Sequence, residues 1–515
     1  MNYKILWADD EIDLLRPHIL FLNQKGYDIE AVNSGADALE KIDHESFDLV
    51  FLDENMPGMT GLETLNYIKS THPNLPVVMI TKSEEEQIME EAIGAKIADY
   101  LIKPLNPNQI LLSVKKILDN KRIISEKTNQ GYMQDFRRLS MDVQDIYEPK
   151  GWADLYKKLV YWELQLNNAD DKSMQEVFTT QKAEANRQFC DFVEENYEDW
   201  LDAGDEAPLM SHQLLESKVF PLLKSEKPVF LIVIDNLRYD QWEEIEPEIA
   251  DIFNVVEKDS YYSILPTTTA YARNSLFAGM LPIDIASKYP QYWSGEDEEG
   301  SKNNFEKELL EVNLKRKKLQ GKFSYHKIIK ASEGKQLVEN FNNLLVNQLN
   351  AVVFNFVDML SHARTDVAMI RELAPDESAY RSLTRSWFAH SSLFDFLKLI
   401  AQQDAKVMIT TDHGTIRVRK PSKIVGDRNT NTNLRYKQGK NLAFQQSDVF
   451  SSRRPEDLGL PKVNVSTSFA FARDDFFFAY PNNFNYYVNY YNDTFQHGGV
   501  SLEEMIIPFV ILEPK

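Results

Sequence analysis

The chain has 515 residues, of which 43% are hydrophobic and 26% are charged, and its net charge is −22 at neutral pH. The length suggests about three domains, and the composition is that of a soluble globular protein. A single cysteine, Cys190, excludes a disulfide framework and suits a reducing compartment. No apolar run reaches the roughly 18 residues of a membrane helix. The N-terminal apolar run meets acidic residues at Asp9, too early for a signal peptide. We therefore expect a cytoplasmic protein without membrane insertion.

Short apolar runs alternate with amphipathic stretches through residues 1–122, which predicts a doubly wound, flavodoxin-like parallel sheet. Function gathers at the carboxyl ends of the strands in such sheets. Four runs end in polar residues: Lys4–Ala8 before Asp9 and Asp10, Leu49–Leu52 before Asp53, Val77–Ile80 before Thr81, and Tyr100–Ile102 before Lys103. Three converging carboxylates repel one another unless a hard cation lies among them, and Mg²⁺ prefers carboxylate oxygen. We expect a magnesium site at this edge.

Residues 1–122 resemble the receiver domain of two-component response regulators. The motifs that carry the resemblance are ADDE, FLDENMPGMTG, ITK and YLIKP. The resemblance implies a phosphoryl transfer from a sensor histidine kinase and a switch that responds to the new charge. It assigns these roles: Asp53 as the phosphorylated residue, Asp9 and Asp10 as Mg²⁺ ligands with the Asn55 backbone, and Thr81, Tyr100 and Lys103 as switch residues. It also implies a homodimer that forms on phosphorylation.

Residues 123–205 show apolar and aromatic side chains at helical spacing, including Trp152, Tyr156, Phe189 and Trp200. These stripes indicate the core of a small helical bundle that links the flanking domains. The segment is acidic and carries no helix-turn-helix signal, which argues against a DNA-binding transcription factor.

Three apolar runs in the remaining chain lead to aspartate, and histidines follow closely. The runs and their polar neighbours are VFLIVI before Asp235, AVVFNFV before Asp358 and His362, and KVMITT before Asp412 and His413, while His497 precedes two glycines. Three Asp and three His form two sets of three ligands, which is how catalytic zinc is commonly held. Such sites also accept manganese. Two metals about 3.5–4 Å apart would clamp the attacking and leaving oxygens of a phosphoryl transfer.

The order of these residues resembles the alkaline phosphatase superfamily, and the words VIDNLRYD, PTTTAYARNSLFAG and HGGVSLEEMIIP resemble its PglZ branch. The resemblance covers residues 206–515 and implies a C-terminal α/β domain of alkaline-phosphatase type with a metal-dependent phosphodiesterase activity. It also implies the grouping of the zinc ligands: Asp235, Asp412 and His413 for one ion, and Asp358, His362 and His497 for the other.

The nucleophile is expected to be a hydroxyl at a helix start, where a metal lowers its pKa. Thr267, Thr268 and Thr269 compete for this role. In related diesterases a glycine follows the nucleophile motif by ten residues, and Gly279 stands in that relation to Thr269. We therefore choose Thr269, with Thr268 as the alternative.

The stretch Thr415–Arg454 holds ten Lys or Arg against two Asp and directly follows two zinc ligands. We expect it to lie over the site entrance, where Arg417, Arg419 and Lys420 would bind an oligonucleotide or cyclic nucleotide phosphodiester. A solvated loop is the other interpretation of such a run.

A receiver, a helical middle and a PglZ domain in one chain resemble the PorX-like response regulators, a family associated with type IX secretion in Bacteroidota. That resemblance implies secretion control and phosphodiesterase activity on oligonucleotides, together with transcription or secretion proteins as partners. The competing hypothesis is a regulatory scaffold whose PglZ domain binds metal and partners without catalysis.

Overall fold

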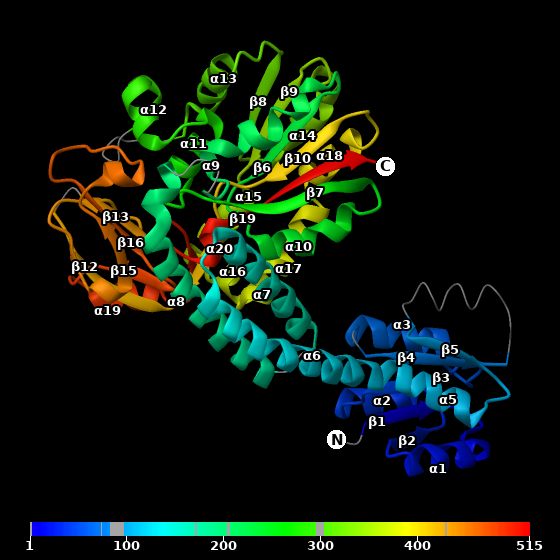
Figure 1. The fold of residues 1–515 in the computed structure, drawn as a ribbon. Helices are drawn as coiled ribbons and strands as arrows, with labels where there is room; N and C mark the ends of the chain where they lie inside the picture. Colours follow the sequence, from blue (N-terminus) through cyan, green and yellow to red (C-terminus); the bar gives the residue numbers. More distant parts are fainter. Residues whose placement is uncertain are drawn as a thin grey trace. The chain divides into compact units, whose positions relative to one another are not determined.

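The computed structural model describes residues 3–73, 75–82, 97–169, 172–202, 207–294, 303–427 and 430–515. The chain divides into two compact units. The first is Met1–Met133 with Asn168–Asp171, and the second is Gln134–Asn167 with Lys172–Lys515. Each unit is described by itself (Figure 1). Among the helices that the structure describes, none combines the length and apolar character needed to cross a membrane.

The first unit is a five-stranded parallel sheet with helices on both faces. The strand order is β2-β1-β3-β4-β5, with bounds Asp28–Val32, Lys4–Ala8, Leu49–Asp53, Val77–Thr81 and Asp99–Ile102. Helices α1 (Arg16–Gln24) and α5 (Pro107–Val114) pack on one face, and α2 (Gly35–His44) and α3 (Gly61–Thr71) on the other. The central strands are buried on both sides, which explains their continuous apolar runs. The predicted doubly wound N-terminal sheet is confirmed.

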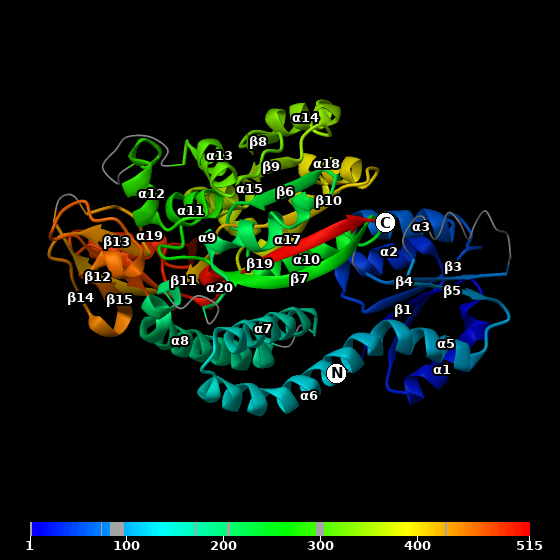
Figure 2. The same ribbon diagram turned by 45° about the horizontal axis from the view of Figure 1, so that its top comes forward.

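Three long helices form the middle of the chain: α6 (Asn120–Asp142), α7 (Pro149–Ala169) and α8 (Lys172–Asp202). The division between the two units falls within α6. The Trp152 ring of α7 meets Phe189 and Phe192 of α8, with ring centroids 5.5 and 5.8 Å apart. The aromatic stripes are therefore a helix–helix core, as their spacing predicts. Figure 2 shows α7 and α8 beside β7, β19 and α20 of the second unit.

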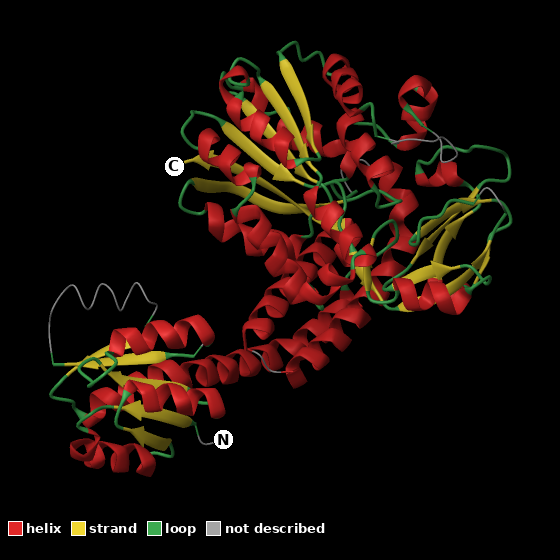
Figure 3. Cartoon of the chain, turned by 180° about the vertical axis from the view of Figure 1, so that it is seen from behind, coloured by secondary structure: helices red, strands yellow, loops and turns green. Residues whose placement is uncertain are grey.

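The main sheet of the second unit has the order β7-β19-β10-β6-β9-β8. The bounds are Phe253–Tyr262, Ile506–Pro514, Lys406–Thr410, Val229–Ile234, Leu349–Phe354 and Phe323–Ile328. β10, β6, β9 and β8 are parallel, whereas β19 runs antiparallel to both neighbours. Helices cover both faces (Figure 3). On one face are α10 (Tyr239–Ile249), α14 (Ala331–Glu339), α17 (Glu377–Ala389) and α18 (Ser392–Ile400), and on the other α9 (Ser211–Leu214), α11 (Asn274–Ala278), α12 (Pro282–Lys288) and α13 (Glu306–Arg316).

The apolar run AVVFNFV before Asp358 was expected to be one strand. The structure shows that this expectation is wrong. β9 ends at Phe354, and α15 (Phe356–Asp366) begins two residues later. A short apolar run cannot distinguish a buried strand from the first turn of a buried helix, because both conceal every side chain. As a result, Asp358 and His362 lie four residues apart on one helix and face the same side.

An insertion between β10 and β19 forms small sheets of its own. It contains the two-stranded sheet β11-β18 and the three-stranded sheets β14-β12-β17 and β13-β16-β15. The bounds in chain order are β11 Ile416–Val418, β12 Lys420–Val425, β13 Tyr436–Gly439, β14 Ala443–Phe444, β15 Val449–Ser452, β16 Ser468–Ala472, β17 Phe476–Ala479 and β18 Thr494–Gln496, with α19 (Phe484–Tyr491) before β18 and α20 (Leu502–Met505) after it. Much of the basic stretch Thr415–Arg454 is therefore strand and not loop.

Candidate functional site

Two acid–histidine clusters lie at the carboxyl ends of the central strands of the second unit. The inner trio is Asp235, directly after β6, with Asp412 and His413, which follow β10. One ligand atom from each lies within 4.8 Å of the others, and all three side chains are buried. Parallel pairing of β6 with β10 brings their ends to the same edge, so the topology of the sheet assembles this trio.

The outer trio is Asp358 and His362 of α15 with His497, which follows β18. Each histidine Nε2 lies 3.5 Å from a different oxygen of the Asp358 carboxylate. His362 has 61% of its side chain exposed, whereas Asp358 and His497 have 17% and 14%. The site is therefore open to solvent on the side of His362.

The two trios are neighbours. The imidazole rings of His413 and His497 are stacked with centroids 4.3 Å apart. Asn236 connects the trios, because its backbone N–H donates to Asp412 at 3.3 Å and its amide Nδ2 donates to Asp358 at 3.3 Å. Its φ of 64° lies in the left-handed region, which asparagine tolerates better than most side chains. Sequence reasoning missed Asn236, although an asparagine directly after a strand-end aspartate is a usable signal.

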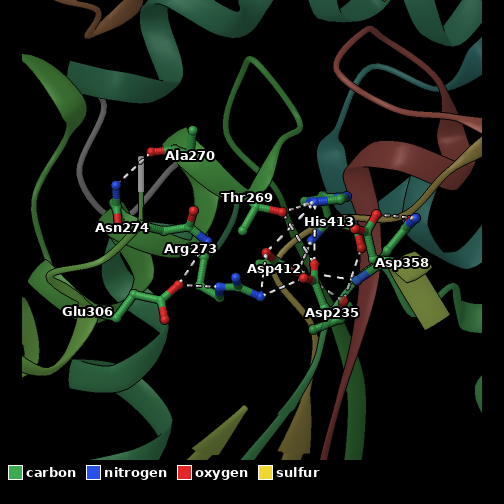
Figure 4. A network of polar contacts seen from close by, with 12 residues as sticks. Asp235, Thr269, Ala270, Arg273, Asn274, Glu306, Asp358, Asp412 and His413 are labelled. Atoms are coloured by element: carbon green, nitrogen blue, oxygen red, sulfur yellow. Dashed lines mark hydrogen bonds and ion pairs between the residues drawn. The ribbon is translucent and has the colours of Figure 1, made fainter. Parts of the chain in front are cut away.

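Thr269 is the threonine whose hydroxyl faces the inner trio. Its Oγ1 lies 3.3 Å from Asp235 Oδ1 and 3.1 Å from His413 Nε2 (Figure 4). The Thr267 hydroxyl donates to the Gly499 backbone carbonyl at 2.9 Å, so it has a structural role. The Thr268 hydroxyl is buried and has no hydrogen-bond partner among the described residues. Of the three threonines, Thr269 alone combines partial exposure with contact to this trio.

A buried arginine, absent from the sequence prediction, neutralises the inner trio. Arg273 Nη1 lies 2.8 Å from Asp235 Oδ2 and 3.7 Å from Asp412 Oδ2, while its Nε donates to Glu306 at 2.6 Å. Figure 4 shows the guanidinium between Glu306 and the two aspartates. The arginine stands four residues after Thr269 on the same helical segment, so one segment supplies both the hydroxyl and the positive charge.

The ionisation of the trios follows from burial and from neighbouring charges. Burial raises the pKa of Asp235 well above its ordinary value, against the opposing charge of Arg273. Burial alone would also raise the pKa of Asp412, but His413 and Arg273 outweigh it and lower this pKa. Burial lowers the pKa of His413 to about 4, so its imidazole is neutral at pH 7 and able to bind a metal.

These residues fit two zinc ions. Each trio mixes carboxylate oxygen with imidazole nitrogen, a donor set typical of catalytic zinc. The buried Asp412 Oδ2 accepts no hydrogen bond from the described residues, which leaves it free to bind a cation. A cation at the inner trio would also favour the ionised form of Asp235. Asp235, Asp412 and His413 would hold one ion, and Asp358, His362 and His497 the other.

The receiver cluster in the first unit is made of oxygen ligands. Oxygens of Asp9, Asp10 and Asp53 lie within 4.8 Å of one another. Lys103 Nζ bridges Asp9 at 2.8 Å and Asp53 at 3.0 Å. Burial raises the pKa of Asp53, and the hydrogen bond from Lys103 opposes the rise. This oxygen-only set, open to water at Asp10, fits Mg²⁺.

The remaining predicted receiver residues lie on or after the strands that carry this cluster. Thr81 is buried at the end of β4, and Asn55 is exposed two residues after Asp53. Tyr100 is half-buried on β5 and packs with the apolar cluster that α2 and α3 cover. The strands thus bring Thr81 and Lys103 to the edge that carries Asp53, since β3, β4 and β5 are consecutive and parallel.

The structure places the three predicted substrate-binding cations differently from one another. Arg417 Nη2 pairs with Asp493 at 2.6 Å. Lys420 Nζ pairs with Asp474 at 2.9 Å and with Asp475 at 2.7 Å. The Arg419 side chain is exposed. Two of the three charges are therefore already balanced by carboxylates of the insertion.

Helix α8 holds the segment that carries a ligand of the outer trio. Leu502 N–H, five residues after His497, donates to Asn186 Oδ1 at 2.8 Å. Asn186 Nδ2 donates to Glu503 at 2.9 Å, and Lys182 Nζ pairs with Glu503 at 2.9 Å. Sequence reasoning missed these contacts, because a polar residue on an aromatic-rich helix is usually assigned to its solvent face.

Three family profiles match successive parts of the chain. Residues 5–115 match the response regulator receiver domain, residues 122–201 the PorX response regulator linker domain, and residues 214–512 the BREX system PglZ alkaline phosphatase-like domain. The predicted order of receiver, linker and PglZ domain is thereby confirmed. The chain is a response regulator fused to an alkaline phosphatase-like domain.

Individual relatives match the receiver part. The transcriptional regulatory protein ZraR of Escherichia coli O157:H7 is 35% identical over 127 residues, which cover 25% of this chain and 29% of ZraR. The CpxR homolog of Haemophilus influenzae is 37% identical over 117 residues, or 22% of this chain and 50% of that protein. The chain thus spans half or less of the length of these relatives.

Among solved structures, the CheY-like receiver domain protein of Methanospirillum hungatei JF-1 is 28% identical, with 23% of this chain and 96% of that chain covered and a TM-score of 0.23. The PglZ profile extends over more than half of the 515 residues. The chain therefore belongs to the PglZ family.

Proposed function

We propose that the protein is a two-component response regulator whose PglZ domain is a two-zinc phosphodiesterase with Thr269 as its nucleophile. One observation carries the proposal: the Thr269 hydroxyl contacts Asp235 and His413 of the inner trio, next to a second trio of the same donor types. Zinc ions held by the two trios would supply Lewis-acid stabilisation of the phosphoryl oxygens and lower the pKa of the attacking hydroxyl.

The residues of the chain account for the remaining steps. Thr269 Oγ1 forms a bond to phosphorus while the bond to the leaving alkoxide breaks. The hydroxyl proton passes to solvent water, and water protonates the leaving alkoxide to an alcohol. Water then hydrolyses the threonine-linked phosphodiester, which releases a phosphomonoester and restores the hydroxyl. Neutral His413 and Asp235 orient the Thr269 hydroxyl, and Arg273 offsets the negative charge that accumulates among the carboxylates. The exposed His362 marks the side from which the diester enters.

Thr269→Val tests the nucleophile, with Thr268→Val as the matched control. Valine keeps the shape of threonine without its oxygen, so Thr269→Val should abolish diester cleavage while the zinc content stays near two ions per chain. Thr268→Val should retain most activity. The reverse result would move the nucleophile by one residue, and activity in both variants would mean that water attacks directly.

The oligonucleotide or cyclic nucleotide substrates, the sensor kinase and the role in type IX secretion belong to the same proposal. They rest on the receiver, the linker and the PglZ domain being present together. Among the three predicted cations, Arg419 is the best candidate for a phosphate contact, because Arg417 and Lys420 are paired with acids. A non-catalytic scaffold would bind zinc but cleave none of a panel of phosphodiesters, whereas the proposal requires both properties in one sample.

Phosphorylation of Asp53 would control the enzyme through dimerisation of the receiver and the helical linker. Helix α8 supports this route, because Lys182 and Asn186 hold α20 and the segment after His497. A small displacement of α8 would therefore change the position of one ligand of the outer trio. Coupling of this kind requires only about 1–3 kcal/mol.

A further inference from the structure

Helix α19 in the insertion has an unusual composition. Its sequence FNYYVNYY holds four tyrosines and a phenylalanine in eight residues, yet none of these eight residues is buried. Tyr486 is 64% exposed. The rings of Tyr486 and Tyr490 are nearly parallel, with centroids 6.2 Å apart, and those of Tyr487 and Tyr491 repeat this arrangement. Tyr491 packs against the apolar cluster of Ile416, Val418 and Phe477, so the pair Tyr487–Tyr491 faces the protein. The pair Tyr486–Tyr490 is the outer one, with the Tyr486 ring exposed where most proteins place charged residues.

A hydrogen bond links this tyrosine helix to the helix of the outer trio. The Tyr490 hydroxyl donates to Asp366 Oδ1 at 2.9 Å. Asp366 ends α15 and lies four residues beyond His362, a rise of about 6 Å along the helix. His362 is the exposed ligand of the site, and β18 leads from α19 directly to His497. The Tyr486–Tyr490 pair therefore lies beside the open side of the outer trio.

A pocket at the beginning of α19 adds polar groups to the aromatic surface. Its volume is about 390 Å³, and the residues that line it include Tyr480, Asn482, Asn483 and Tyr487. This size is typical of sites for small organic molecules, which span about 300–1,000 Å³. Lys423 Nζ lies 4.9 Å from the Phe484 ring centroid, so a cation borders the same surface.

We propose that α19 and this pocket bind unpaired nucleobases of a single-stranded nucleic-acid substrate. The proposal rests on the phosphodiesterase function and adds a base-recognition subsite to it. Tyrosine faces stack on any base, asparagine amides can hydrogen-bond to base edges, and the nearby lysine suits a phosphate backbone. Bases held on α19 would present the adjoining phosphodiester to the site beside His362.

Binding to an oligomer with bases and to an abasic oligomer of the same length tests the subsite. The full-length Thr269→Val protein, loaded with zinc, is titrated into a fluorescein-labelled oligodeoxyadenylate of about eight nucleotides, within the usual range for single-strand sites. We expect this oligomer to bind about tenfold more tightly than the abasic one, since stacking on one aromatic ring contributes that much. Tyr486→Ala should remove most of the difference, and Tyr486→Trp should keep it. Tyr161→Ala, which removes an exposed tyrosine of α7, is the matched control and should also keep it.

Equal affinity for the two oligomers, or an undiminished difference in Tyr486→Ala, would overturn the subsite. So would a shift in sedimentation of Tyr486→Ala without nucleic acid, because α19 would then be a contact between copies of the chain. The two proposals can fail separately. A protein with intact Thr269 that shows the base preference but cleaves no diester would contradict the enzyme and leave the subsite standing, whereas cleavage without base preference would do the opposite.

Discussion

The receiver cluster and the inner trio are built on the same plan but differ in their surroundings. In both, carboxylates at the carboxyl ends of parallel strands share one cation, Lys103 in the receiver and Arg273 in the PglZ domain. The receiver cluster has oxygen ligands and opens to water at Asp10. The inner trio includes an imidazole, is fully buried and adjoins a second trio.

This difference relates ligand chemistry to function. An open set of oxygen ligands suits a hydrated Mg²⁺ that exchanges readily and assists transfer of a phosphoryl group to Asp53. A buried set of oxygen and nitrogen ligands suits a metal that stays bound through many turnovers. The sheet edge supplies the convergence in both cases, and burial together with the donor atoms decides which ion and which chemistry follow.

Removal of metal should separate the two clusters most clearly. We expect a zinc chelator to lower the unfolding free energy of the PglZ domain by more than about 5 kcal/mol, since zinc bound by a preformed site adds directly to folding stability. Loss of Mg²⁺ should change the receiver by less than about 1 kcal/mol, because that ion keeps much of its water. Calorimetry with two resolved transitions measures both.

Single-ligand variants sharpen this result. His497→Ala should lose mainly the outer ion and Asp235→Asn mainly the inner one, as elemental analysis of the purified variants would show. Equal loss of both ions from each variant would contradict two separate sites. If metal removal destabilised the receiver as much as the PglZ domain, the proposed difference in metal binding between the two clusters would be wrong.

Substitution of the bridging cation should also destabilise the inner trio more than the receiver cluster. In chelator-treated protein, Arg273→Met leaves Asp235 buried without its partner, at a cost of about 3–5 kcal/mol. Lys103→Met should cost less than Arg273→Met, because Lys103 keeps 11% of its side chain exposed and Asp10 opens the cluster to water. Urea unfolding of the two variants measures the difference, and zinc should restore much of the stability of Arg273→Met. A larger loss for Lys103→Met would reverse the assignment of the buried site.

A third pair of carboxylates, outside the proposed metal sites, shows how burial changes the pKa of an aspartate. Lys420 bridges Asp474 and Asp475 as Lys103 bridges Asp9 and Asp53. Burial, with repulsion from Asp475, raises the pKa of Asp474 to about 6. The folded protein thus binds this proton more tightly than the unfolded chain. The resulting stability is fully present below the ordinary pKa of 3.8 and is lost as the pH rises through about 6.

Asp474→Asn should therefore flatten the pH dependence of the unfolding free energy between about pH 4 and 6. Above that range the variant should be more stable than the wild type by up to about 3 kcal/mol, because the buried carboxylate of the wild type is then ionised at a free-energy cost that asparagine avoids. Asparagine also tolerates the positive φ of 44° at this position. Chemical denaturation across the pH range tests this, and an unchanged slope would show that burial does not perturb the carboxyl.

The coupling between the two regions should be worth about 1–3 kcal/mol. Beryllofluoride with Mg²⁺ mimics phosphorylation of Asp53 and should convert a monomer into a symmetric dimer in sedimentation experiments. Asp53→Ala should not respond. The diesterase rate of the wild type should change with the mimic, and Asn186→Ala should weaken that change, because its contacts with Leu502 and Glu503 are lost. A sedimentation mass that stays the same with and without beryllofluoride would contradict regulation by dimerisation.

Some of the site follows from local sequence because it depends on strand ends. A buried strand must be largely apolar, so an acid at or just after its end marks the sheet edge, as Asp53, Asp235 and Asp412 do. The same reasoning misjudged the run before Asp358, since α15 begins inside it. Asp358 and His362 come together through helical spacing and not through a strand end.

The sequence by itself determined the order of the domains, the apolar strands and the residue types available to hold metals, because these depend on periodicity and on chemistry along the chain. Only the tertiary structure decided which partners those residues meet. Arg273 faces the inner trio, Arg417 and Lys420 are paired with acids of the insertion, and Tyr486 remains exposed. The physical reason is that the electrostatic free energy of a charge and the burial of a ring are set by atoms distant in sequence, and folding alone brings those atoms together.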